Sequence, residues 1–233
     1  MPFHRFSYIT LAVIKWPLAL LSLVYFPSVA WALWQEILNE TGALTFVFLG
    51  TMVYAALWWL SIRKWTISWL STFEHELTHC LFAWLTGNKV GAIKVTLRGG
   101  GHVTVIGSPN WLIDVAPYFF PTGTVVLLLL STLLTYLDII GWQLAIGASL
   151  SYHVTSTMTN THQGQTDLQK AGFIFCWMFL PTANVVGLGL TLAGASAGWS
   201  GISRWFSIVN QAPWNTTLFH LISGCNTSLT RLA

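Results

Sequence analysis

The chain has 233 residues, of which 54% are hydrophobic and only 7% are charged, and its formal net charge is +3. An ordinary soluble domain carries about 25% charged residues, so this composition excludes a water-soluble globular protein and favours one embedded in a lipid bilayer. The ten Lys and Arg residues form no basic stripe, so nucleic acid is not expected as a partner.

Six apolar runs are long enough to cross a membrane, since about 20 residues span its hydrocarbon core. They cover residues 8–34, 43–62, 65–86, 116–137, 139–160 and 172–195. The first run could be a secretory signal, but Lys15 and Pro17 interrupt its apolar core, which favours a retained first span. Residues 199–233 are broken by Pro213 and are expected to lie along the membrane interface.

Residues 89–107 depart from this helical pattern. Their β-branched residues alternate on either side of Gly99, Gly100 and Gly101, which is typical of a β-hairpin with a glycine turn. This hairpin is either an ordered loop or an edge strand that pairs with an extended peptide. The predicted fold is therefore an all-α polytopic membrane protein with about six transmembrane helices and a small β-hairpin, forming a single domain over residues 1–233.

The third run begins with a cluster of polar residues in the sequence TFEHELTHCLFAWLTG. His75 and His79 lie one helical turn apart, so both imidazoles can reach one ion, and Glu76 lies beside them. This is the H-E-x-x-H arrangement, in which two histidines bind zinc and the glutamate acts as general base. The alternative is two hydrogen-bonded core histidines, but ionisable groups are costly within a span, which favours zinc.

Zinc needs a third protein ligand, and no glutamate follows the motif. The remaining candidates are aspartates and histidines, namely Asp114, Asp138, Asp167, His102, His153, His162 and His220. Counted along the spans, Asp138 lies at the wrong membrane face, whereas His153 lies at the depth of His79. Asp167 lies in a polar bend that can fold back into a protein-lined cavity, or it caps the helix that begins near Leu168.

The H-E-L-T-H motif, the glycine-rich hairpin, the segment APYFFP and the aspartate of QTD occur in this order. Together, over about residues 65–175, they resemble the site-2 protease family of intramembrane zinc metalloproteases, in its compact branch without a PDZ domain. The resemblance implies that His75 and His79 bind zinc, that Glu76 is the catalytic base and that Asp167 is the third ligand. Leu168 stands where the family motif has glycine.

The sequence thus predicts a multi-pass protein of the cell's inner membrane that uses Zn²⁺ to hydrolyse a peptide bond of a transmembrane protein or peptide. Asp167 is preferred to His153 as third ligand because a carboxylate reduces the charge of a buried dication. His153 is then the alternative ligand or the group that stabilises the oxyanion. A metal-ion transporter and a catalytically inactive membrane scaffold are the alternatives.

Overall fold

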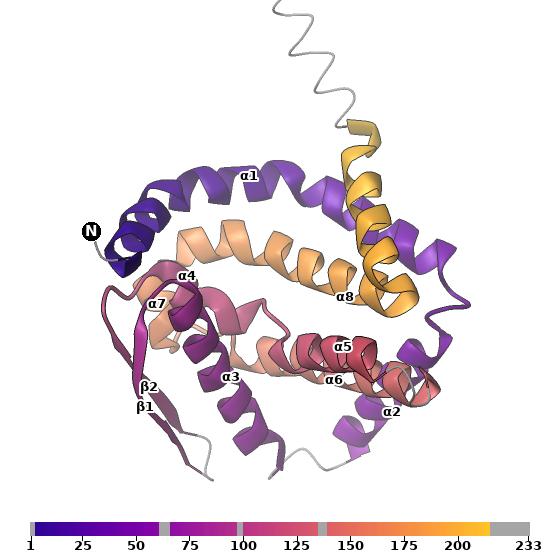
Figure 1. The fold of residues 1–233 in the computed structure, drawn as a ribbon, viewed down its shortest axis with the longest axis horizontal. Coiled ribbons are helices and arrows are strands. Elements are labelled where there is room, and N and C mark those ends of the chain that lie inside the picture. The colour runs from indigo at the N-terminus through magenta and orange to yellow at the C-terminus, as the bar shows by residue number, and fades with distance from the viewer. Residues whose placement is uncertain (1–2, 61–65, 97–99, 135–138, 215–233) are drawn as a thin grey trace, which may run out of the picture.

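The computed structural model describes residues 3–60, 66–96, 100–134 and 139–214, and it is mainly helical (Figure 1). Each predicted apolar run overlaps one of the longer helices. These are α1 (Phe3–Asn39), α2 (Thr45–Leu60), α3 (Thr66–Leu85), α5 (Thr122–Leu133), α6 (Ile139–Asn160) and α8 (Phe173–Asn210). Three short elements lie between them, namely α4 (Trp111–Val115), the 3₁₀ turn η2 (Ala116–Tyr118) and α7 (Thr166–Ala171). The predicted class, helices with one small hairpin, is confirmed.

The number of membrane spans differs from the six that were predicted. Among the described residues, α1 and α8 alone are single helices long and apolar enough to cross a bilayer. A third span results if Trp111–Tyr118 and Thr122–Leu133, bent by 76°, are counted together. The 16 residues of α2 rise about 24 Å, less than the hydrocarbon thickness of about 30 Å, while α3 and α6 carry many polar side chains. Two or three such helices indicate an integral membrane protein, but a count of six is not supported.

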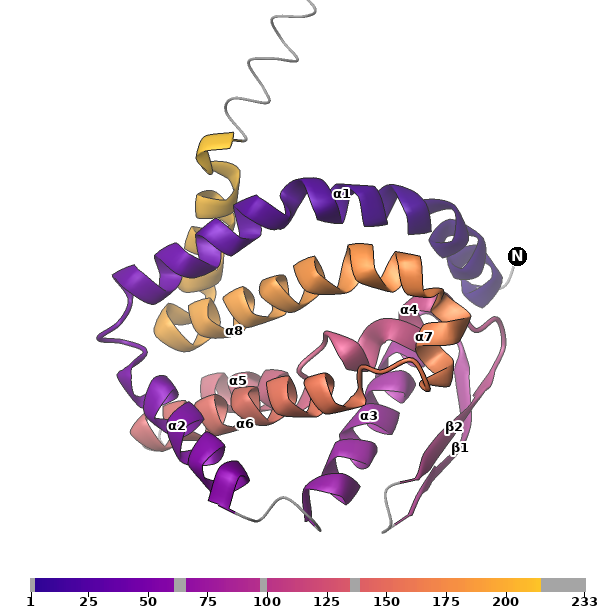
Figure 2. The same cartoon turned by 180° about the vertical axis from the view of Figure 1, so that it is seen from behind.

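Helix α8 continues beyond the predicted span and bends near Gly198, which has a positive φ of 58°. After the bend, the helix crosses α1 (Figures 1 and 2). Trp205 is buried there, and Arg204 forms an ion pair of 2.8 Å with Glu36 of α1. Part of the segment that was expected along the membrane interface is therefore packed against protein, and residues 215–233 lie outside the described structure.

The predicted hairpin consists of β1 (Lys89–Val95) and β2 (Gly101–Ile106), which pair antiparallel. Residues 97–99 of its turn, with the predicted glycine 99, lie outside the described residues. At the other end, Asn88 Oδ1 accepts a hydrogen bond of 2.6 Å from the backbone N–H of Ser108, which ties the two strand ends together. The hairpin lies alongside α3, and β2 faces the site described below (Figure 1).

The long helices form two groups. Helix α1 and the first part of α8 run side by side, whereas α2, α5 and α6 form the second group (Figures 1 and 2). Helices α2 and α6 approach closely because each presents a glycine to the other: a Cβ at Gly50 or Gly147 would overlap the opposite backbone. This close packing fixes α6 in place within the second group.

A buried cluster joins α1, α4, η2, α7 and α8 at the end where the hairpin begins. Its largest members are Trp111 of α4, Tyr118 of η2 and Phe175 and Phe179 of α8. The Trp111 and Phe175 rings pack edge to face with centroids 4.8 Å apart. The short helices α4 and α7 are therefore held by apolar packing, which fixes the backbone that surrounds the polar site.

Candidate metal centre

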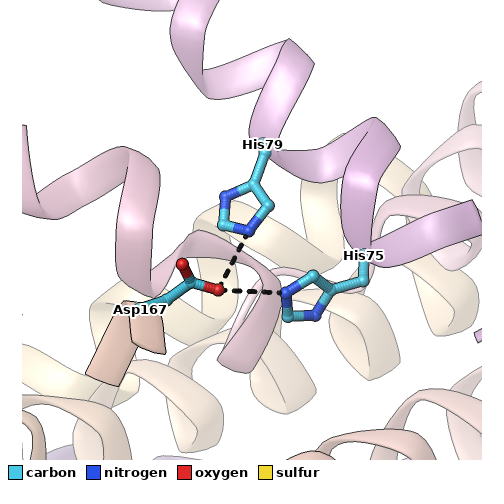
Figure 3. Close-up of side chains that lie close together, drawn as sticks. All are labelled: His75, His79 and Asp167. Carbon is cyan, nitrogen blue, oxygen red and sulfur yellow. Dashed lines mark hydrogen bonds and ion pairs between the residues drawn. The ribbon is translucent and has the colours of Figure 1, made fainter. Parts of the chain in front are cut away.

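Two histidines of α3 and one aspartate of α7 lie close together (Figure 3). The rings of His75 and His79, one turn apart on α3, have centroids 4.8 Å apart. Asp167 Oδ2 lies 3.4 Å from His75 Nε2 and 3.3 Å from His79 Nε2. Within the described part of the chain, no other group of three such side chains could hold a metal ion.

The three side chains fit a zinc ion in chemistry and in spacing. Ligand atoms about 2.0–2.1 Å from a tetrahedral zinc lie about 3.3–3.4 Å from one another, and both distances to Asp167 Oδ2 have these values. His79 Nδ1 lies 2.8 Å from the carbonyl oxygen of Ile113. When Nδ1–H donates to that carbonyl, the lone pair of Nε2 is free for a metal, as is usual for zinc-binding histidines.

Asp167 is held as a carboxylate by its surroundings. Burial alone would raise its pKa, but hydrogen bonds and charge interactions with His75 and His79 outweigh burial, so the pKa of Asp167 lies below its usual range. The Lys170 ammonium adds a cation 3.6 Å from Asp167 Oδ1. Gln165, and not Asp167, occupies the N-cap of α7, so the alternative in which Asp167 caps this helix does not describe the structure.

A cavity of about 510 Å³ opens beside these side chains. Its walls come from α3, β2, α4 and α7, together with Asn160 at the end of α6. Glu76 also lines the cavity and is only 7% exposed. Because several lining groups are charged or carry amides, the cavity can hold the water that a hydrolytic reaction requires.

His153 is not brought to this site. It is buried in α6 and does not line the cavity. Its Nε2 atom has no hydrogen-bond partner among the described residues. The sequence placed His153 at the same membrane depth as His79. Equal depth does not bring the two side chains together, because α6 does not present His153 to the cavity. The geometry thus supports Asp167 over His153, although the identity of the third ligand stays a prediction.

The other predicted ligand candidates fall into three groups. Asp114 and His102 line the cavity, but their ligand atoms do not belong to the cluster of three. His162 lies in the exposed loop before α7, where it hydrogen-bonds to neighbouring residues. Asp138 and His220 lie outside the described residues. Asp114 and His102 therefore belong to the wall of the cavity but not to the cluster of three.

Two further polar residues of the motif helix have a role that sequence reasoning missed. Glu74 Oε1 accepts a hydrogen bond of 2.7 Å from the backbone N–H of Gly123, and Thr78 Oγ1 lies 2.5 Å from Thr122 Oγ1. Both partners belong to the first turn of α5, where backbone N–H groups have no acceptor within the helix. These contacts hold α3 against α5. Pro121, the last residue of APYFFP and the N-cap of α5, was the signal in the sequence that a new helix with such groups begins there.

The region from α2 to the beginning of α8 matches a known family. The Peptidase M50B-like family model covers residues 47–176, which is more than half of the chain. The chain belongs to the Peptidase M50B-like family. This membership confirms the predicted relationship to site-2 proteases, and it indicates a metalloprotease because the M50 peptidases are zinc enzymes.

The Peptidase M50B-like region contains every residue predicted for the site. His75, Glu76, His79, His153 and Asp167 all lie within it, whereas α1 and most of α8 lie outside. No curated protein and no solved structure matches the chain. The substrate and the compact branch without a PDZ domain therefore stay predictions.

Proposed function

We propose that this chain is a zinc metalloendopeptidase that hydrolyses a peptide bond of a transmembrane protein or peptide within or beside the bilayer. The observation that carries the proposal is the convergence of His75, His79 and Asp167 on one cavity that Glu76 also lines. The proposal treats residues 1–233 as one domain, with the catalytic core over about residues 65–175. The inner membrane of the cell is the proposed location, supported by two or three apolar helices.

In the proposed mechanism, the Nε2 atoms of His75 and His79 and a carboxylate oxygen of Asp167 would hold the metal. When bound, zinc supplies a polarised scissile carbonyl and a water whose pKa is lowered to about 7. Glu76 accepts the proton of the attacking water and returns it to the leaving amine. The Ile113 carbonyl keeps the His79 ring oriented through its hydrogen bond of 2.8 Å.

The hairpin supplies a wall against which an extended substrate can lie. Gly101, His102, Val103 and Val105 of β2 line the cavity, and among the described residues β2 pairs only with β1. An extended peptide that adds to a free strand edge gains main-chain hydrogen bonds without depending on its side chains. Of the two predicted roles of the hairpin, this position favours the edge strand that pairs with substrate.

The experiment that tests the function uses purified full-length protein, a labelled single-span substrate and a zinc chelator. Cleavage that stops with chelator and returns with added zinc is the expected result. Zinc flux into vesicles without cleavage would instead support the metal transporter. A chain with neither activity would be the inactive scaffold.

Gly101 provides a second test, because a side chain there would displace Glu76. A Cβ at Gly101 would lie 2.5 Å from Glu76 Oε1 and 2.7 Å from Glu76 Cγ. We expect Gly101→Ala to lower the cleavage rate about a hundredfold, the effect of a misplacement of about 1 Å. Zinc content should not change, since Glu76 is not a proposed ligand.

Gly91→Ala is the matched control for this substitution. Gly91 lies in β1 of the same hairpin, and the closest atom to a Cβ there would be the flexible end of the Ile106 side chain, at 2.9 Å. It should cleave at close to the wild-type rate. Equal rates for Gly101→Ala and wild type would show that Glu76 does not act from the position that the structure gives it.

A further inference from the structure

Helix α1 makes two polar contacts to the short helices beside the metal centre. The Trp111 indole N–H of α4 donates a hydrogen bond of 2.7 Å to the backbone carbonyl of Leu11. The Lys15 ammonium donates one of 2.7 Å to the backbone carbonyl of Ala171, the last residue of α7. Leu11 and Lys15 are four residues apart, so they lie on one face of α1. The N-terminal part of α1 lies beside α4 and α7 in both views (Figures 1 and 2).

Each of these contacts lies within about one helical turn of a proposed ligand or of the group that orients one. Trp111 is two residues before Ile113, whose carbonyl accepts the hydrogen bond of His79 Nδ1. Ala171 is four residues, about one helical turn, after Asp167. A shift of α4 or α7 would therefore move the His79 ring or the Asp167 carboxylate relative to His75.

The placement of Lys15 needs a specific reason, because it lies inside a helix apolar enough to span a membrane. A lysine within a membrane-spanning helix is costly unless its charge is compensated. Its ammonium is stabilised by the Ala171 carbonyl and by the Phe175 ring, whose centroid lies 5.0 Å away. In return, Lys15 satisfies one of the carbonyl groups that the end of α7 leaves without an intrahelical donor.

We propose that α1, which lies outside the family-matched region, is part of the metal site, with Lys15 as a positioning residue for Asp167 and Trp111 as one for the Ile113 carbonyl. This inference rests on the proposed zinc-binding function. It predicts that loss of the Lys15 ammonium weakens metal binding although Lys15 never touches the ion. Partners that hydrogen-bond directly to metal ligands typically contribute 10- to 100-fold to metal affinity, and Lys15, which acts one helical turn from Asp167, should contribute near the lower end of this range.

The test measures zinc affinity by competition with a chromophoric chelator, together with the visible spectrum of bound Co²⁺. Lys15→Met keeps the length and the apolar stem of the side chain but removes the donor and the charge. We expect zinc affinity to fall about tenfold or more and the Co²⁺ spectrum to change. Lys15→Arg, which keeps a cationic donor, should restore most of the affinity. Lys89→Met, at an exposed lysine of β1, is the matched control and should bind zinc like wild type.

A purely structural role for Lys15 gives a different result. The melting temperature of the Lys15→Met protein would then fall with chelator present, while the affinity of the folded protein for zinc would be unchanged, and this outcome overturns the inference. If Lys15→Met does not fold, Trp111→Phe removes the other donor while it keeps an aromatic ring in the cluster, and unchanged zinc affinity in that variant overturns the inference equally. Wild-type protein that binds zinc without cleaving peptide would refute the proposed function but not the inference. Wild-type protein that binds no zinc would refute both.

Discussion

Glu76→Gln is expected to abolish peptide cleavage while the protein still binds zinc near stoichiometrically. The amide has nearly the same size and helix propensity as the carboxylate, but it cannot accept the proton of the attacking water. Loss of a general base typically lowers a rate about 10²- to 10⁴-fold. Turnover of a labelled single-span substrate and the zinc content of the purified protein are the two measurements.

Two sets of variants make this result specific. Glu40→Gln makes the same chemical change at a carboxylate that pairs with Arg204, remote from the motif helix, and it should leave turnover unchanged. His75→Ala and His79→Ala should lose metal and activity together, because each removes a proposed ligand. Undiminished cleavage by Glu76→Gln would rule out the proposed mechanism.

Asp167→Asn is expected to lose zinc and activity together, whereas His153→Ala should keep the metal. A neutral amide oxygen is a weaker ligand than a carboxylate, and it leaves the buried ion with its full double charge. The loss in affinity should exceed the roughly 100-fold upper range for outer-shell partners. Zinc affinity measured by competition titration, beside the cleavage rate, checks this prediction.

The opposite pattern would show a different ligand set. If Asp167→Asn keeps zinc and activity while His153→Ala loses the metal, the third ligand is His153 and the site contains three histidines. The distances of 3.3 and 3.4 Å between Asp167 Oδ2 and the two Nε2 atoms would then reflect hydrogen bonding alone. Asp167→Ser distinguishes ligation from local helix stability, because serine is also a good helix-starting residue but a poor zinc ligand.

Local features of the site could be predicted from the sequence because they depend on residues that are close together in the chain. The H-E-x-x-H spacing places His75 and His79 on one face of any α-helix, and the structure has their ring centroids 4.8 Å apart. The glycines near position 100 and the alternating β-branched residues around them predicted a hairpin, and β1 and β2 are present. The apolar runs likewise predicted where the long helices lie.

The sequence alone did not determine how many helices cross the membrane. Run length was counted from apolar residues, but within the described part of the chain α2 has 16 residues, and α5 meets the preceding short helices at a bend of 76°. Hydropathy measures how well a segment tolerates lipid, and it does not measure whether its polar side chains are satisfied by other helices. The described helices therefore do not support the predicted six spans, whereas the prediction of an integral membrane protein agrees with them.

Only the tertiary structure decided which distant side chains meet the two histidines. Asp167 is 92 residues from His75, and seven aspartates and histidines remained as candidates after the sequence had excluded a downstream glutamate. Helix packing brings α7 to α3 and leaves His153 on the buried surface of α6, and it places Lys15 of α1 against the end of α7. Helical spacing fixes contacts within a few turns, but contacts between helices depend on how their whole surfaces pack. The motif therefore determined the chemistry of two ligands and a base, and the fold determined what surrounds them.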